Sequence, residues 1–302
     1  MKDRTAAISW GASSGATEYV VEVGSTTGGI DGGVHSAGTA TSFTLRDLRA
    51  GRSHVRIKAR NASGTSGASS EATFVLPDLA DYIEAIFLAS GPLVYSPSPG
   101  CGNHGRWSAF PRGTTVRNLV SPQIPSQYRE AIRVVLDQVA QATDGRLAAT
   151  FEVVADAPHT VGVNEMVHVA LQTAGEIQFA CGSISGVACV THNSPVERGA
   201  PFSGGLIRWA VGYYVVPNTP TTRPYAHEPG HGVLGMCHIN ADAIGGRQHS
   251  LMSVGDTPAP TAATSQSERL SPFDIEALQT VYGSSVAIGA RRPEFVAAGL
   301  VK

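Results

Sequence analysis

Two histidines four positions apart most constrain what this chain can fold into. They stand in the run His227-Glu228-Pro229-Gly230-His231, which has the form H-E-x-x-H. On a helix, residues i and i+4 lie one above the other, so both rings can reach a single metal ion. The carboxylate of Glu228, beside them, could take a proton from a metal-bound water. The spacing therefore predicts a helix that carries a metal site. The alternative is an ordinary solvated helix face.

A third ligand is expected from the residues that follow this helix. Gly235 can turn the chain sharply, and His238 lies just beyond it, placed to return to the first two histidines. The neighbouring Cys237 is the alternative, because a thiolate also binds zinc.

Two downstream segments complete a recognisable order of features. The first is Ser250-Leu251-Met252-Ser253, and the second is the segment 270–283, which ends in Leu278-Gln279-Thr280-Val281-Tyr282-Gly283. With the H-E-x-x-H run, they resemble the metzincin zinc peptidases, whose pattern is H-E-x-x-H-x-x-G-x-x-H followed by a Met-turn. The resemblance implies that Met252 is the Met-turn methionine, which supports the metal site from below. It also implies that 270–283 is the C-terminal helix of the matrix-metalloproteinase branch.

The spacing of the third histidine differs from that family pattern by one residue. His238 follows His231 by seven positions instead of six, and Cys237 occupies the literal family position. Gly235 is displaced in step with His238, so we interpret Gly232 as a one-residue insertion and prefer His238 as the third ligand. A bulge or an early end of the helix could absorb the extra residue.

Pro229 is a second departure from an ordinary helix. A proline in a helix interior removes one hydrogen bond and costs about 3 kcal/mol, unless it lies in the first turn. Thr222 and Pro224 are candidates for the N-cap and the first helical position. Pro229 would then lie just past the first turn, so either the helix begins later or the site is strained.

Composition limits the classes of partner. The chain has 302 residues, a length typical of two domains, and a formal net charge of −2, which gives no electrostatic reason to bind nucleic acid or an anionic membrane. No run of 18 apolar residues is present, so no membrane span is expected. Low charge with 34 Gly and 18 Pro suits a secreted protein. Met1-Lys2-Asp3-Arg4 does not begin a signal peptide, so we expect a truncated start.

Residues 1–77 alternate in the manner of short, half-buried strands separated by Gly- and Ser-rich turns, which predicts an all-β sandwich. The run 48–66 resembles a fibronectin type III domain, and Trp10 and Tyr19 stand where that family carries core aromatics. The first strand of such a domain would be largely missing before Ala6. The resemblance implies a spacer module.

The remaining chain divides into three expected segments. Residues 78–99 form a junction with a short helix, residues 100–283 the metzincin-like domain, and residues 284–302 a C-terminal tail. An amphipathic helix over 127–142 and a long strand over 205–216 precede the H-E-x-x-H helix. The expected fold is therefore multidomain: a β-sandwich followed by an α+β domain with a mixed twisted sheet, long helices and a zinc cleft.

Four cysteines allow three pairings. Cys181 and Cys189 flank a Gly/Ser-rich loop and are favoured as a disulfide. Cys101 and Cys237 would then pair or remain free. The alternative is four free cysteines.

The resemblance implies a secreted zinc-dependent endopeptidase. His227, His231 and His238 would bind one catalytic zinc, and Glu228 would act as the general base. The substrate would be a protein or peptide that pairs in extended form with an edge strand, and a monomer is expected. Calcium is common in relatives, but no Asp/Gly loop supports it here. The alternative function is a catalytically weak metzincin-like relic that serves extracellular binding or adhesion.

Overall fold

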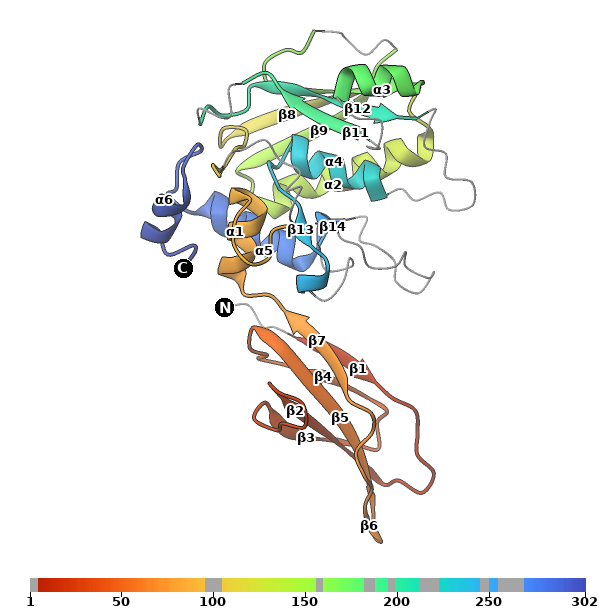
Figure 1. Cartoon of the computed structure of the whole chain (residues 1–302). Coiled ribbons are helices and arrows are strands. Elements are labelled where there is room, and N and C mark those ends of the chain that lie inside the picture. Colours follow the sequence, from red (N-terminus) through yellow and green to blue (C-terminus); the bar gives the residue numbers. More distant parts are fainter. Residues whose placement is uncertain are drawn as a thin grey trace. The chain divides into compact units, whose positions relative to one another are not determined.

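The structure is a computed structural model of the whole chain, in which residues 5–95, 105–155, 160–181, 188–194, 199–211, 223–244, 250–254 and 269–302 are described. The chain divides into two compact units, Met1–Asp78 and Leu79–Lys302 (Figure 1).

The first unit is all-β, as its alternating pattern predicts. Its strands are β1 (Ala6–Ser9), β2 (Glu18–Gly24), β3 (Gly33–Gly38), β4 (Ser42–Leu45), β5 (Gly51–Asn61), β6 (Gly64–Thr65) and β7 (Ala72–Leu76). β1 pairs with β4, and the larger sheet has the order β3-β2-β5-β6, with β7 also paired to β5. Val21, Val23 and Val55 of the larger sheet are buried with Leu45 of the smaller one. The two sheets therefore share one small core.

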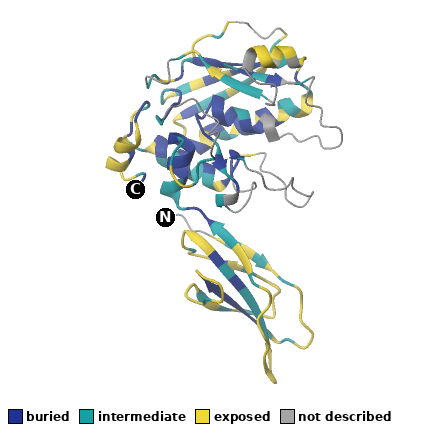
Figure 2. Cartoon of the chain, viewed as in Figure 1, coloured by how far each residue is buried: buried dark blue, intermediate teal, exposed yellow. Residues whose placement is uncertain are grey.

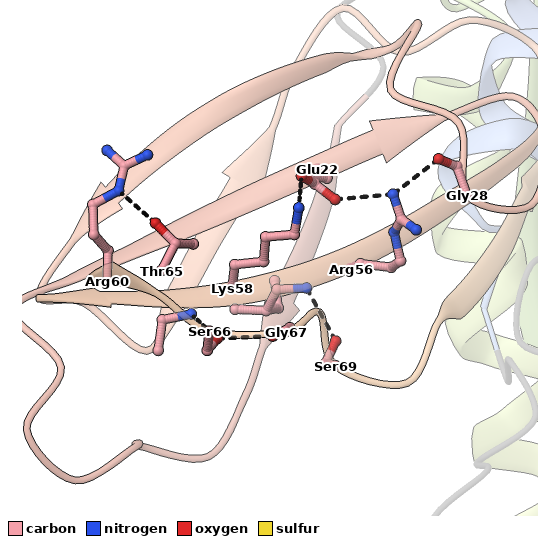
Figure 3. A network of polar contacts seen from close by, with 11 residues as sticks. Glu22, Gly28, Arg56, Lys58, Arg60, Thr65, Ser66, Gly67 and Ser69 are labelled. Atoms are coloured by element: carbon pink, nitrogen blue, oxygen red, sulfur yellow. Dashed lines mark hydrogen bonds and ion pairs between the residues drawn. The ribbon is translucent and has the colours of Figure 1, made fainter. Parts of the chain in front are cut away.

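The opposite face of the larger sheet carries charged residues from β2 and β5. Arg56 and Lys58 each contact one carboxylate oxygen of Glu22 (Figure 3). The distances are 2.9 Å for Arg56 and 2.6 Å for Lys58, and Arg60 pairs with Glu18 at 3.2 Å. Pairs as exposed as Arg60–Glu18 contribute little to stability. The alternation of charged and apolar residues along β5 thus separates a polar face from the core face.

The second unit contains a five-stranded mixed sheet. Its strands are β8 (Thr114–Val120), β9 (Leu147–Val153), β10 (Glu165–Leu171), β11 (Ala188–His192) and β12 (Gly204–Ala210). The order is β11-β12-β10-β8-β9, and all neighbours are parallel except β11 and β12, which are antiparallel. Multiple sheets together with helices make the chain a multidomain α+β protein, as expected.

Two helices, α2 (Ser126–Ala142) and α4 (Arg223–Gly232), pack against each other and against this sheet, α2 on β9 and α4 on β11 and β12 (Figure 1). The stripe Ile132, Val135 and Val139 of α2 is fully buried. The amphipathic pattern that predicted α2 therefore faces the core. α3 (Ala174–Cys181) also packs on β11 and β12.

The remaining helices of the described chain are α1 (Leu79–Leu88), α5 (Pro272–Gly283) and α6 (Arg292–Ala297), with a 3₁₀ turn at Asp242–Ile244. Two short parallel strands, β13 (Ile239–Asn240) and β14 (Ser253–Val254), lie between α4 and α5 in sequence. α1 packs against α5 and β13. Among the described residues, we find no helix with the length and apolar character needed to cross a bilayer.

Two segments treated as peripheral in the sequence analysis lie inside the second unit. Seven of the ten residues of α1, within the junction 78–99, are buried. Much of this helix has the colour of buried residues in Figure 2. In the tail 284–302, Phe295 of α6 is fully buried and packs edge-to-face on Trp107, with ring centroids 6.2 Å apart. Both segments therefore contribute side chains to the core, and neither is only a connector or a tail.

Candidate metal centre

The structure brings three histidine side chains to one point. His227 and His231 lie one turn apart on α4 and are buried, and His238 comes from the chain between α4 and β13. The Nε2 atoms of the three rings are 3.1 Å apart in each of the three pairs. These side chains form a group that could hold a metal ion.

Main-chain carbonyls determine which ring nitrogen carries the proton. His227 Nδ1 lies 2.8 Å from the carbonyl oxygen of Leu251, and His231 Nδ1 lies 2.6 Å from that of Met236. Because a carbonyl only accepts hydrogen bonds, both Nδ1 atoms are protonated and donate. In the neutral form of each ring the lone pair then lies on Nε2, and the two Nε2 atoms are 3.1 Å apart. Two facing lone pairs repel, unless a cation lies between them.

The protonation state of His231 suits a metal ligand. Burial, and then the charge of His238, lower the pKa of His231 to about 3. The ring is therefore neutral near pH 7, which is the form that coordinates metals.

The chain leaves α4 after His231 through a turn that is wider than a helical one. The amide of Leu234 lies 3.4 Å from the carbonyl of Pro229, five residues earlier, and the amide of Met236 lies 2.9 Å from that of Gly230. These bonds span more residues than the i to i−4 bonds of an α-helix. α4 itself ends at Gly232, so this wide turn follows the end of the helix and leads the chain to His238.

The turn that returns His238 to the site depends on Gly235. Its φ of +66° is in the left-handed region, and a Cβ there would lie 1.8 Å from the carbonyl oxygen of Ser108. Only glycine fits both conditions. The sharp turn expected at Gly235 is therefore present.

Gly232 itself occupies a tight position beside the sheet. A Cβ on it would lie 2.8 Å from Cδ1 of Ile207 on β12, and its carbonyl lies 3.0 Å from Nε2 of His192 on β11. Burial lowers the pKa of His192 to about 4, so the neutral ring donates this hydrogen bond from Nε2. The sequence analysis did not identify His192, because nothing in the spacing connects it with the end of α4.

Pro229 lies in the interior of α4, as expected from a helix that begins near Pro224; Thr222 lies outside the described residues. The proline does not keep His227 and His231 apart, since their Nε2 atoms are 3.1 Å from each other. Glu228 follows His227 on α4 and is partly exposed to solvent.

Met252 lies directly against α4. It is fully buried, and a Cβ on Gly230 would lie 2.4 Å from its sulfur. Gly230 lies between His227 and His231 in sequence and has no side chain. The Met252 side chain therefore occupies the space beside α4 at this position. This position agrees with a structural role for Met252.

The turn around Met252 is held by a buried carboxylate that the sequence analysis missed. Asp274 of α5 accepts hydrogen bonds from Ser250 Oγ at 2.8 Å and from the amide of Leu251 at 2.9 Å. It also forms a capping box with Ser271 at the start of α5. The spacing Ser-x-x-Asp could have predicted the cap. It carries no information on the contact with residues 250 and 251.

The cysteines narrow the choice of third ligand. Cys189 and Cys237 are disulfide-bonded, so Cys237 offers no thiolate and the alternative of four free cysteines is excluded. Cys101 and the side chain of Cys181 lie outside the described residues. The pairing of Cys181 with Cys189 therefore stays a prediction, and His238 is the third member of the cluster.

Comparisons with known proteins add little to the site. No protein-family model matches this chain, and no curated protein does. Among solved structures, the twitchin kinase region from C. elegans (Fn31-NL-kin-CRD-Ig26) matches with 27% sequence identity and a TM-score of 0.20. The match covers 24% of this chain and 14% of that chain, so this chain spans a small part of its length. So small a likeness carries no argument about fold or activity.

Proposed function

We propose that this chain is a zinc-dependent endopeptidase of the metzincin class. The observation that carries the proposal is the convergence of three Nε2 atoms, 3.1 Å apart, two of them with their lone pairs fixed toward the centre by carbonyl partners. The position of Met252 against α4 supports the same class.

The cluster fits zinc better than it fits most other ions. Two nitrogens bound tetrahedrally to one zinc at about 2.0–2.1 Å are about 3.3 Å from each other, close to the separation seen here. Calcium and magnesium prefer oxygen ligands, whereas neutral imidazoles suit zinc. Three protein ligands are also the number found in catalytic zinc sites, which keep a fourth position for water.

The side chains of this chain would then have separate roles. When bound, zinc lowers the pKa of its water toward about 7 and polarises the scissile carbonyl. His227, His231 and His238 hold the ion. Glu228 takes a proton from the attacking water and passes it to the leaving amine. Met252 supports α4 and takes no part in the chemistry.

The strand β11 is the best candidate for substrate pairing. It is an edge of the five-stranded sheet, has β12 as its neighbour among the described strands, and packs against α4. An extended peptide can add to such an edge through main-chain hydrogen bonds. A protein or peptide substrate lying along β11 would therefore pass close to the three histidines.

The first unit and the cellular location are further parts of this proposal. We assign the first unit as a fibronectin type III-like spacer, because its two sheets share a core and its charged face is internally paired. The disulfide-bonded Cys189 and Cys237 favour an oxidising compartment, which suits a secreted protein.

The direct test combines metal analysis with hydrolysis of an unfolded protein substrate by the full chain. We expect one equivalent of zinc and an activity that chelation abolishes. Glu228→Ala should keep zinc and lower the rate by about 10²–10⁴-fold, because general base catalysis contributes that much. Glu130→Ala, on the exposed side of α2, serves as the control and should change neither quantity. An unchanged rate in Glu228→Ala would contradict the mechanism.

The second candidate function is a catalytically weak relic that serves binding or adhesion. The interior Pro229 and the widened turn after Gly232 favour it, since both depart from a regular helix at the metal ligands. Stoichiometric zinc without hydrolysis by either the unchanged chain or Glu228→Ala would support this alternative over the peptidase.

A further inference from the structure

Helix α1, which has no part in the proposed mechanism, is connected to the metal centre by hydrogen bonds that begin at the hydroxyl of Tyr82. Tyr82 lies on the first turn of α1 and is fully buried. Its hydroxyl donates to Oδ1 of Asp274 at 2.6 Å. The junction helix, which the sequence suggests is only a connector, therefore reaches the carboxylate that holds the turn at residues 250–253.

From Tyr82, a continuous path of contacts leads to a metal ligand. Asp274 Oδ2 accepts from the amide of Leu251 at 2.9 Å, and the carbonyl of Leu251 accepts from Nδ1 of His227 at 2.8 Å. Leu251 is thus held at both its main-chain polar groups, one by the carboxylate and the other by the ligand. A shift of the carboxylate moves Leu251, and a shift of Leu251 changes the orientation of the His227 ring.

The carboxylate of Asp274 is buried, and its charge is stabilised by the hydrogen-bond donors around it. Each oxygen accepts two hydrogen bonds: Oδ1 from Tyr82 and Ser250, and Oδ2 from the amides of Leu251 and Ser271. Four donors around two oxygens indicate the ionised form, and all four are neutral groups. Asp274 and Tyr82 are both fully buried. Water therefore cannot readily replace a lost donor, and the remaining charge would be poorly solvated.

Tyr82 is suited to donate this hydrogen bond under all ordinary conditions. Burial, and then the charge of Asp274, raise the pKa of the Tyr82 hydroxyl well above its usual value. The hydroxyl therefore keeps its proton across the pH range in which a zinc site forms.

We propose that Tyr82 is a positioning residue of the metal centre, which acts through Asp274 and Leu251 to fix the His227 ring in its metal-binding orientation. The inference rests on the metal centre of the proposed function, and not on peptidase activity. It assigns α1 a role in metal affinity. Partners one step beyond a metal ligand typically contribute 10–100-fold to metal affinity, and Tyr82 lies further out, so about tenfold is expected.

The test is the zinc affinity of the full chain carrying Tyr82→Phe, measured by competition with a chromophoric chelator. We expect a dissociation constant about tenfold higher than that of the unchanged chain. The visible absorption spectrum of the cobalt-substituted protein should also change, because it reports the geometry of the ligands. A merely structural role for Tyr82 would lower stability, but it would move neither the spectrum nor the affinity of the folded chain.

The chain offers a matched control in Tyr282. This tyrosine is also fully buried in the second unit, and its hydroxyl has no hydrogen-bond partner among the residues that the structure describes. Tyr282→Phe therefore removes the same atom without touching the path to His227, and its zinc affinity and cobalt spectrum should equal those of the unchanged chain.

The outcomes separate this inference from the proposed function. Equal affinities and spectra for Tyr82→Phe and the unchanged chain would overturn the role of Tyr82 alone. Equal losses in Tyr82→Phe and Tyr282→Phe would also overturn it. Zinc binding without peptidase activity would overturn the proposed function alone. An unchanged chain that binds no zinc would overturn both.

Discussion

What the histidine cluster can bind depends on the hydrogen bonds of the Nδ1 atoms as well as on the positions of the Nε2 atoms. The carbonyls of Leu251 and Met236 each accept from one Nδ1, so the Nε2 atoms of His227 and His231 are the ones that can coordinate a metal. Cys237 is in a disulfide, so the third position belongs to His238. At the residue scale, the site is therefore defined as much by main-chain acceptors as by the ligands.

Gly230 gives a prediction at this scale. Its Cβ position is 2.4 Å from the Met252 sulfur, so Gly230→Ala should force Met252 to move and lower the free energy of unfolding by about 1–3 kcal/mol, the usual cost of overpacking. Urea unfolding of the metal-free chain measures this. Gly283→Ala, at the end of α5 with open space around it, is the control and should cost nothing. Equal stability of both variants would contradict the packing of Met252 on α4.

At the scale of elements, the end of α4 is fitted to strand β11. The widened turn brings the Gly232 carbonyl to 3.0 Å from His192, whose ring stacks on Phe202 with centroids 3.5 Å apart. The carbonyl of Gly232, at the end of α4, therefore has a hydrogen-bond donor on the neighbouring strand. The same strand is the proposed edge for substrate pairing, so the helix end and the substrate edge are connected.

His192 tests this arrangement. His192→Leu removes the donor and leaves the Gly232 carbonyl buried without it, so the free energy of unfolding should fall by about 1–3 kcal/mol. His192→Gln keeps an N–H donor of similar reach and should recover part of that loss. Chemical denaturation of both metal-free variants is the measurement. If the two variants lost the same stability, the hydrogen bond would not be what holds the end of α4.

At the scale of the whole molecule, the two units differ in their buried titratable groups. In the second unit, His168 of β10 is fully buried, its Nε2 lies 3.0 Å from Asn118 Oδ1, and burial lowers its pKa to about 3. In the first unit, His54 is partly exposed and lies 2.6 Å from Glu71. Acid should therefore affect the two units differently.

Acidification should destabilise the second unit first. Unfolded histidine takes up a proton near pH 6.5, whereas folded His168 stays neutral to about pH 3, so the unfolded state binds more protons between these values. Stability should fall with falling pH by up to about 1.4 kcal/mol per pH unit from this group. Calorimetry of the metal-free chain at pH 7 and pH 5 should show the larger decrease in the transition of the second unit. His168→Gln should reduce that decrease; an unchanged decrease would assign it to other groups.

Much of the candidate site could be predicted from the sequence because its ligands are close together in the chain. Helical periodicity places His227 and His231 on one face, and Gly235 provides the turn that returns His238. The expectation of an all-β part followed by an α+β part with a mixed sheet rests on equally local patterns. These features follow from the geometry of a few consecutive residues.

Only the tertiary structure decided how the site is supported. Asp274, Tyr82 and His192 reach it from α5, α1 and β11, and their contacts depend on packing between elements far apart in sequence. Spacing carries no information on such contacts, since it fixes periodicity within an element and not which elements meet. The sequence by itself therefore determined which side chains could bind a metal. The folded chain determined which ring nitrogens bond to main-chain carbonyls, the wide turn that brings His238 back, and the buried carboxylate that supports the turn around Met252.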